Sequence, residues 1–181
     1  MTRFVAFLRA VNIGGRTIKM EQLRRSLEAL GLTRVETFIA SGNVAFDSSK
    51  AREEALRKRI EAKLKEDFGF EVPTFLRTDA ELNAIARFEA FSPSKFREPE
   101  SRLFVAFLMA PLPPDAERAL TQQSSAVDEF RVHGREIYWL CHVRWSDSDF
   151  SGAKLEKTVG TATTVRNINT VRRMAEKLAG S

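Results

Sequence analysis

The segment from Asn12 to Lys19 combines paired glycines with basic side chains between a predicted strand and a predicted helix. Gly14 and Gly15 would let backbone N–H groups approach an anion, which the positive end of the following helix also favours. Arg16 and Lys19 would add donors. A glycine turn with two exposed basic residues explains the same pattern. The spacing matches neither G-x-G-x-x-G nor G-x-x-x-x-G-K-[ST], so it does not indicate a dinucleotide site or a P-loop.

A second polar segment lies near the end of the chain, directly before a predicted helix. Its candidate ligand-binding residues are Thr163, Arg166, Asn167, Asn169 and Thr170. The planar guanidinium of Arg166 suits a carboxylate or a phosphate. Asn167 or Asn169 can cap the helix, and an ordinary polar surface loop explains the segment equally well.

The tripeptide Ser41-Gly42-Asn43 joins two predicted strands. A hairpin needs such residues whatever the protein does, because Gly and Asn tolerate a positive φ. We nevertheless include Ser41 and Asn43 among the candidate ligand-binding residues. The pattern does not decide whether this turn approaches Asn12.

These segments favour the binding of a small anionic, phosphate-bearing ligand between the two halves of the chain. If the protein is an enzyme, they favour electrostatic stabilisation by Arg16, Lys19 and Arg166, since no activated nucleophile is visible in the sequence. Catalytic residues and cofactors stay unassigned. A nucleic-acid binding module, and a structural or interaction protein without a ligand, are the alternatives.

The sequence argues against a metal site. His133, Cys141 and His142 are the imidazole and thiol groups of the chain. Cys141 and His142 are neighbours at a predicted strand end, so they should point to opposite faces of the sheet. We therefore expect neither a zinc site nor a Cys–His catalytic pair.

An internal repeat organises the elements that carry these segments. The run Phe4 to Ala10 recurs as Phe104 to Ala110, with a single difference between Arg9 and Met109. Both runs are apolar and rich in Val and Phe, as expected of central strands covered by helices.

The periodicity after each copy predicts the fold. The first copy gives β-α-β-β-α-β, with strands at 4–10, 35–40, 44–47 and 72–77 and helices at 20–30 and 51–67. The second gives strands at 102–109, 129–132 and 136–141, helices at 114–123, 152–159 and 168–178, and no obvious closing strand. We predict an α/β (α+β) protein of two ferredoxin-like (split βαβ) units, with antiparallel sheets and helices on one face. The predicted domains are 1–90, which includes a further helix at 79–88, a linker at 91–101, and an incomplete second unit at 102–181.

Composition favours a soluble globular protein. The chain has 181 residues, with 29 basic and 24 acidic side chains, a formal charge of +5 and one cysteine. A lone Cys141 gives no disulfide framework, which suggests a reducing compartment. The apolar run at the N-terminus is too short for a signal peptide or a membrane span, so we expect a cytoplasmic protein without a membrane partner. The basic residues of 52–65 alternate with glutamates at helical spacing, which makes nucleic acid a less favoured partner than a small anion.

Three stretches together carry a resemblance to a known family. They are 8–15 (LRAVNIGG), 38–46 (FIASGNVAF) and 162–171 (ATTVRNINTV). In sequence and spacing the chain resembles the bacterial domain-of-unknown-function family 1697, in which Gly is more frequent at the place of Ala10 and an aromatic residue at the place of Ile168. The resemblance implies a two-part α/β protein with ferredoxin-like halves, and it implies no activity.

Overall fold

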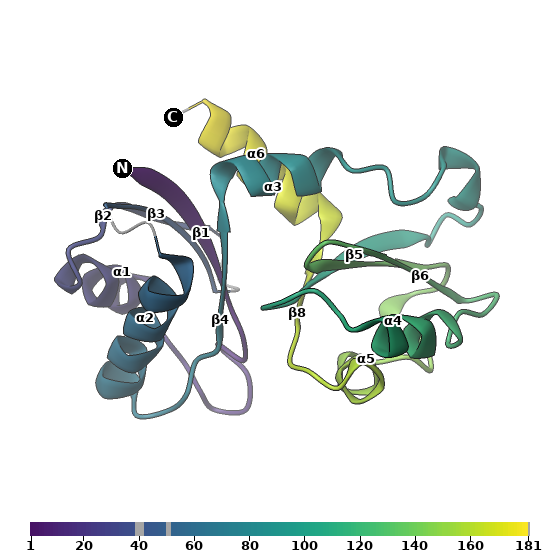
Figure 1. Ribbon diagram of the computed structural model, residues 1–181, viewed down its shortest axis with the longest axis horizontal. Helices are drawn as coiled ribbons and strands as arrows, with labels where there is room; N and C mark the ends of the chain where they lie inside the picture. Colours follow the sequence, from purple (N-terminus) through teal and green to yellow (C-terminus); the bar gives the residue numbers. More distant parts are fainter. Residues whose placement is uncertain (39–41, 50–51, 181) are drawn as a thin grey trace. The chain divides into compact units, whose positions relative to one another are not determined.

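The chain folds into two compact units, Met1–Asn83 and Ala84–Ser181. The computed structural model describes residues 1–38, 42–49 and 52–180. Each unit contains one four-stranded antiparallel sheet (Figure 1). Among the described residues, no helix is both long enough and apolar enough to cross a lipid bilayer.

Unit 1 has the predicted order of elements. These are β1 (Thr2–Leu8), α1 (Met20–Ala29), β2 (Thr33–Phe38), β3 (Asn43–Ser48), α2 (Glu53–Phe68) and β4 (Thr74–Thr78). The strand order is β2-β3-β1-β4, with β1 antiparallel to both β3 and β4. The split βαβ prediction is confirmed for this unit.

Helical periodicity explains how α1 and α2 cover one face of this sheet (Figure 1). Leu23 and Leu27 of α1 lie four residues apart, as do Ile60 and Leu64 of α2, and all are fully buried. They pack against alternate residues of β1, including Phe4. Because strand side chains alternate between faces, β1 presents its remaining residues to the opposite face.

Unit 2 has the same order of strands and helices as unit 1, and one further helix follows its last strand. Its elements are β5 (Arg102–Phe107), α4 (Pro114–Thr121), β6 (Asp128–His133), β7 (Glu136–Cys141), α5 (Gly152–Val159), β8 (Thr164–Asn167) and α6 (Ile168–Ala179). The strand order β6-β7-β5-β8 is that of unit 1 with each element replaced by its counterpart. Two similar ferredoxin-like halves are therefore present, as predicted.

The expectation that unit 2 lacks a closing strand is wrong. β8 pairs antiparallel with β5 and places Arg166 opposite Val105. The strand has four residues, Thr-Val-Arg-Asn, and lies at the sheet edge. So short and polar a run carries no recognisable alternation, which is why the sequence indicated a loop.

Helices lie on both faces of the second sheet. Trp139 and Ala106 pack with residues of α4 and α5 on one face. Tyr138 points to the other face, where its hydroxyl donates to the Ile85 carbonyl in α3 (Asp79–Arg87) at 3.4 Å. α3 is joined to α6 by a 3.3 Å hydrogen bond from Arg172 Nε to the Ala86 carbonyl.

The predicted linker at 91–101 contains the short 3-10 helix η1 (Pro93–Lys95). Lys95 Nζ lies 2.7 Å from a carboxylate oxygen of Glu129 on β6, so this segment is attached to unit 2. The change from one unit to the other falls within α3. The domain limits at residues 90 and 102 stay a prediction.

Candidate functional site

The loop after β1 is a tight hairpin in which the N–H groups of Asn12 and Arg16 are bonded within the loop. The Asn12 N–H donates to the Arg16 carbonyl at 2.7 Å, and the Arg16 N–H donates to the Ile13 carbonyl at 3.2 Å. Gly14 and Gly15 form its tip with φ values of 60° and 80°. Two successive positive φ angles are what a type I′ turn requires, so the turn alone explains both glycines. The tip itself is exposed.

Side chains fix the rest of this loop. Asn12 has φ 63°, and its Oδ1 accepts a 3.1 Å hydrogen bond from the Ile18 N–H. Ile18 is buried in the core, which anchors the loop next to the start of α1. The Arg16 guanidinium carbon lies 5.5 Å from the centroid of the Phe70 ring. Lys19 is the N-cap residue of α1, without a side-chain capping hydrogen bond.

Gly42, the residue directly before β3, lies beside the beginning of this loop. The Leu8 N–H donates to the Gly42 carbonyl at 2.7 Å. A Cβ atom at Gly42 would lie 3.1 Å from Leu8 Cβ and 3.4 Å from Val11 Cβ. Asn43 is fully buried within β3, opposite Phe7 of β1. Ser41 lies outside the described residues.

The C-terminal segment is built into unit 2 by local hydrogen bonds. The Thr163 N–H donates to Glu156 Oε1 of α5 at 2.9 Å. Asn167 caps α6, because its Oδ1 accepts from the Asn169 N–H at 2.9 Å. Asn169 is exposed and Thr170 is half-buried. The predicted capping role of Asn167 is confirmed.

Arg166 is the candidate residue with the most unusual environment. Its NH1 donates to Thr164 Oγ1 at 2.7 Å and to the Val165 carbonyl at 2.9 Å. Burial lowers the pKa of Arg166 from its ordinary value to about 10, because the charged guanidinium is partly removed from water. An anion beside this side chain would compensate for that lost solvation.

The candidate residues thus form two local groups. Asn12, Gly14, Gly15 and Arg16 come together in unit 1, and the residues around Arg166 come together in unit 2. That both groups belong to one ligand site stays a prediction.

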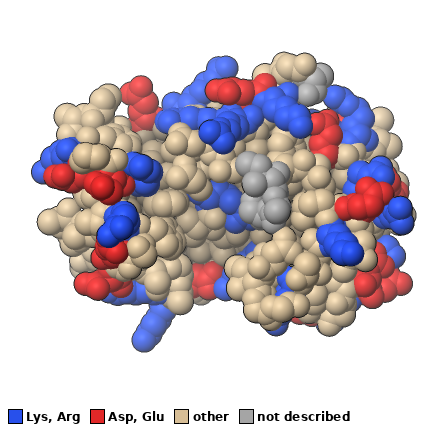
Figure 2. Space-filling model, turned by 180° about the vertical axis from the view of Figure 1, so that it is seen from behind, with Lys and Arg blue, Asp and Glu red and all other residues tan. Residues whose placement is uncertain are grey.

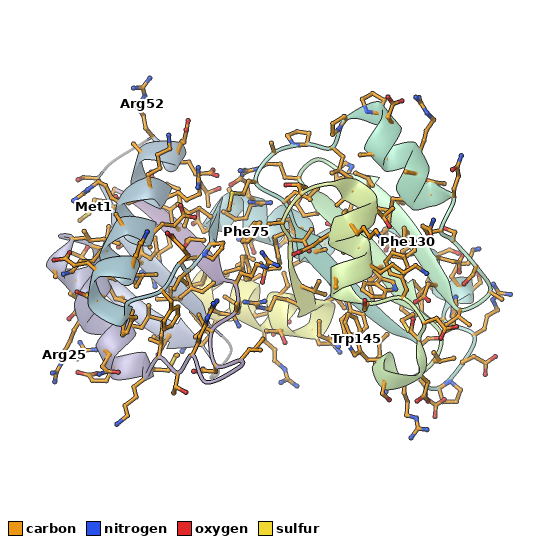
Figure 3. The ribbon with its side chains drawn as sticks, turned by 90° about the horizontal axis from the view of Figure 1, so that it is seen from below. Met1, Arg25, Arg52, Phe75, Phe130 and Trp145 are labelled. Atoms are coloured by element: carbon orange, nitrogen blue, oxygen red, sulfur yellow. The ribbon has the colours of Figure 1, made fainter. Side chains whose placement is uncertain are left out.

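The basic residues of α2 are largely neutralised by their own helix. Arg57 pairs with Glu61 at 2.9 Å, and Lys63 pairs with Asp67 at 2.8 Å. Figure 2 shows Lys and Arg beside Asp and Glu over much of one face of the molecule. Arg25 and Arg52 extend outward from unit 1 (Figure 3). This mixture is typical of a solvated surface.

Comparison with known proteins identifies the family. The family described as "Protein of unknown function (DUF1697)" matches residues 1–138. The chain belongs to this family. The match spans two of the three stretches that carry the resemblance, 8–15 and 38–46, and ends halfway along β7.

The chain is similar to a solved structure, that of the conserved bacterial protein SP0830 from Streptococcus pneumoniae. It is 23% identical, covers 99% of both chains and superimposes with a TM-score of 0.72. At this level of identity the likeness establishes the fold alone. No protein among the curated ones matches the chain.

DUF1697 is a family of unknown function, and the side chains of this chain define what chemistry is available. The described residues contain no group of three or more His, Cys, Asp or Glu placed to hold a metal ion. Cys141 is buried in the unit 2 core, and burial raises the pKa of its thiol. A thiol in this state is a poor nucleophile.

Sequence reasoning missed one polar network of unit 2. Ser101 Oγ lies 3.1 Å from His142 Nδ1, and His142 Nε2 lies 2.8 Å from Glu129 Oε2. The predicted β6–β7 hairpin could have placed Glu129 near His142, because its register follows from the turn. Ser101 could not have been assigned to this network from the sequence, because it lies 41 residues before His142 and precedes a different strand.

Proposed function

We propose that this protein binds a small phosphate-bearing anion and that Arg166 of unit 2 contacts it. The observation that carries the proposal is the half-buried guanidinium of Arg166 at the edge strand β8, which hydrogen bonds to Thr164 and Val165 hold in place and whose loss of solvation lowers its pKa. Removing a cation from water is costly, and an anionic ligand beside the guanidinium would add a favourable charge interaction.

The surroundings of Arg166 suit an anion. Thr164 Oγ1 fixes one end of the guanidinium, so less side-chain entropy is lost when a ligand binds. The residue that follows Arg166 caps α6, a helix of 12 residues whose N-terminus carries partial positive charge. Phosphate fits this position because a planar guanidinium can donate to two of its oxygens at once, as it also can to a carboxylate.

A thermal-shift screen tests the proposal. Inorganic phosphate, a sugar phosphate and a nucleoside monophosphate are the probes, each titrated to saturation against the full chain. A ligand at 100 times its dissociation constant adds about 2.7 kcal/mol, or about 5 to 10 °C in Tm for a chain of this size. We expect such a shift with at least one probe.

Variants assign the shift to Arg166. Arg166→Gln should abolish it, and Arg166→Lys should weaken it because the planar fork is lost. Arg25→Gln is the control, since Arg25 is a largely exposed residue of α1. Absence of any shift from the three probes, or an equal shift in Arg166→Gln, would refute the proposal. In the same screen, Arg16→Gln tests whether the unit 1 loop contributes.

A further inference from the structure

Three polar side chains form a continuous hydrogen-bonded series at one end of the unit 2 sheet. Ser101 precedes β5, His142 follows β7, and Glu129 lies on β6. Both ring nitrogens of His142 are engaged, Nδ1 with Ser101 Oγ and Nε2 with Glu129 Oε2. Ser101 and His142 are buried.

The register of the sheet explains why these residues meet. Arg102 pairs with Cys141, so Ser101 and His142 extend the β5–β7 ladder by one step. Glu129 pairs with Leu140 on the neighbouring strand, two residues before His142. Diagonal neighbours of this kind are within reach of long side chains. The His142 N–H donates to the Val127 carbonyl at 2.8 Å and holds the strand end in place.

The directions of the hydrogen bonds are mutually consistent. Glu129 is held ionised, because hydrogen bonds from Lys95 and then His142 lower the pKa of its carboxyl. A carboxylate only accepts, so Nε2 of His142 carries the hydrogen and Nδ1 of the neutral ring is an acceptor. Ser101 Oγ accepts from the Glu98 N–H at 3.2 Å and is therefore set to donate to Nδ1. A serine hydroxyl that donates to an imidazole oriented by a carboxylate is the arrangement that activates a nucleophile.

A depression of about 550 Å³ adjoins His142. Its volume is within the range of small-molecule sites. Val127 and Val143 supply apolar surface, and Glu98 and Glu100 supply negative charge. The guanidinium of Arg144 in the same lining is paired with Asp147 at 2.9 Å. The depression, which is lined by His142 and by Glu100, the residue before Ser101, therefore suits a neutral or cationic molecule, unlike the anion site proposed at Arg166.

We propose that Ser101, His142 and Glu129 form a hydrolytic site for small neutral or cationic esters. Ser101 Oγ forms a bond to the carbonyl carbon while its proton moves to His142 Nδ1. The bond from that carbon to the alcohol oxygen breaks, and the alcohol leaves with the proton. Water then adds to the acyl-serine and gives a proton to Nδ1. As the carboxylic acid departs, that proton returns to Ser101 Oγ.

Within this site Ser101 and His142 are the catalytic residues, and Glu129 is a positioning residue. Glu129 holds the Nε2–H tautomer of His142 and stabilises the imidazolium that forms during each transfer. Lys95 in turn keeps Glu129 ionised through a 2.7 Å contact. The proposal is independent of the anion site, because it involves none of the residues around Arg166.

The experiment treats the unmodified full-length chain with p-nitrophenyl acetate and, separately, with a fluorophosphonate probe. Peptide mass spectrometry then locates the covalent adduct. We expect the adduct on Ser101 and its loss in Ser101→Ala. Ser92→Ala is the control, because Ser92 is an exposed serine that precedes η1 in the same unit. His142→Gln should slow adduct formation by about 100-fold or more, the usual contribution of a general base.

The role of Glu129 is tested by the rate of adduct formation in two variants. Glu129→Gln, which lacks the carboxylate that accepts from His142 Nε2, should slow adduct formation by about 10-fold or more. Glu129→Asp keeps a carboxylate and should restore part of that rate, whereas a merely structural role for Glu129 would leave the two variants equally slow. An unmodified Ser101 in the wild-type chain with both reagents, or an equal rate in His142→Gln, would overturn the proposal. The wild-type result needs no variant to fold.

Discussion

Arg77 and Arg166 occupy the same position in their respective sheets. Arg77 of β4 lies opposite Val5, and Arg166 of β8 lies opposite Val105, the repeat equivalent of Val5. In each case NH1 donates to the carbonyl of the preceding residue, Leu76 at 2.6 Å and Val165 at 2.9 Å. The internal repeat therefore extends from the first strand of each unit to the last.

Replacing Arg166 by an apolar residue should stabilise the fold. The folded-state pKa of Arg166, about 10, lies below the ordinary value for arginine, so the unfolded chain holds this proton more tightly. The charge therefore costs stability at neutral pH, by about 3 kcal/mol before its hydrogen bonds are counted, and the cost fades as the pH rises above about 10. We expect Arg166→Met to raise the free energy of unfolding by about 1 to 3 kcal/mol.

Urea denaturation at neutral pH measures this change. Arg25→Met on the exposed face of α1 is the control and should stay within about 0.5 kcal/mol of the wild type. A less stable Arg166→Met variant would mean that the hydrogen bonds of Arg166 outweigh its desolvation. If Arg166→Met is more stable and no longer binds the ligand, Arg166 behaves as a residue that is retained for function at a cost in stability.

The central strands should each contribute heavily to stability. Phe7 and Phe107 are fully buried at equivalent positions of the repeat. Changing either to Ala should cost about 3 to 5 kcal/mol, since a large cavity is left in a packed interior. Phe96→Ala is the comparison, because Phe96 is 41% exposed. Near-wild-type unfolding midpoints for both core variants would contradict the assignment of β1 and β5 as central strands.

Gly42 should tolerate a side chain less well than Gly134. Both have a positive φ, 73° and 61°, so an Ala at either position is strained by about 1 kcal/mol or more. At Gly42 the new Cβ would also lie 3.2 Å from the Leu8 carbonyl oxygen, whereas at Gly134 its nearest neighbour is Glu136 Oε2 at 3.5 Å. Gly42→Ala should therefore lower the Tm more than Gly134→Ala. Equal losses would show that the contact with Leu8 relaxes freely.

The Lys95–Glu129 contact should make stability depend on pH in acid. The pKa of Glu129 is lowered below 4.5, chiefly by the hydrogen bond from Lys95. The stability that ionised Glu129 contributes to the fold is therefore fully present above pH 4.5. It is lost as the pH falls through the lowered pKa of the folded state. Lys95→Gln should be less stable than the wild type near neutral pH, and the difference should shrink in acid. Urea midpoints across this range measure it, with the exposed Lys157→Gln as control; a difference independent of pH would disagree with the assigned contact.

Binding to nucleic acid should be weak at physiological salt. The cations of α2 are paired within the helix, as Arg57 is with Glu61. A protein that neutralises Z phosphates loses affinity with a salt slope of about −0.9Z for duplex and about −0.7Z for single strands. We expect little binding of mixed single-stranded oligonucleotides and a shallow slope in a salt titration. Tight, steeply salt-dependent binding that disappears when Arg57, Lys58 and Arg59 are changed to Ala would make nucleic acid the primary partner.

The sequence by itself determined the duplicated fold. The repeat of 4–10 in 104–110, the leucine spacing of α1 and α2, and the glycines that end strands and helices are local signals. They can be recognised in the sequence because burial of one face makes apolar residues recur about every 3.6 residues in helices and about every 2 residues in strands. Arg166 could also be selected as a candidate residue from the sequence, since a guanidinium before a helix is a property of adjacent residues; that it binds an anion stays a prediction.

The tertiary structure decided what depends on pairing between distant strands. β8 forms because its backbone pairs with the edge of β5, although its own four residues show no alternation typical of a strand. The lowered pKa of Arg166 arises from burial, which no single segment encodes. Ser101, Glu129 and His142 meet because the β5–β7 and β6–β7 registers bring three strands into line. Long-range register is set by the whole core, so chemistry that depends on it is not readable from spacing along the chain.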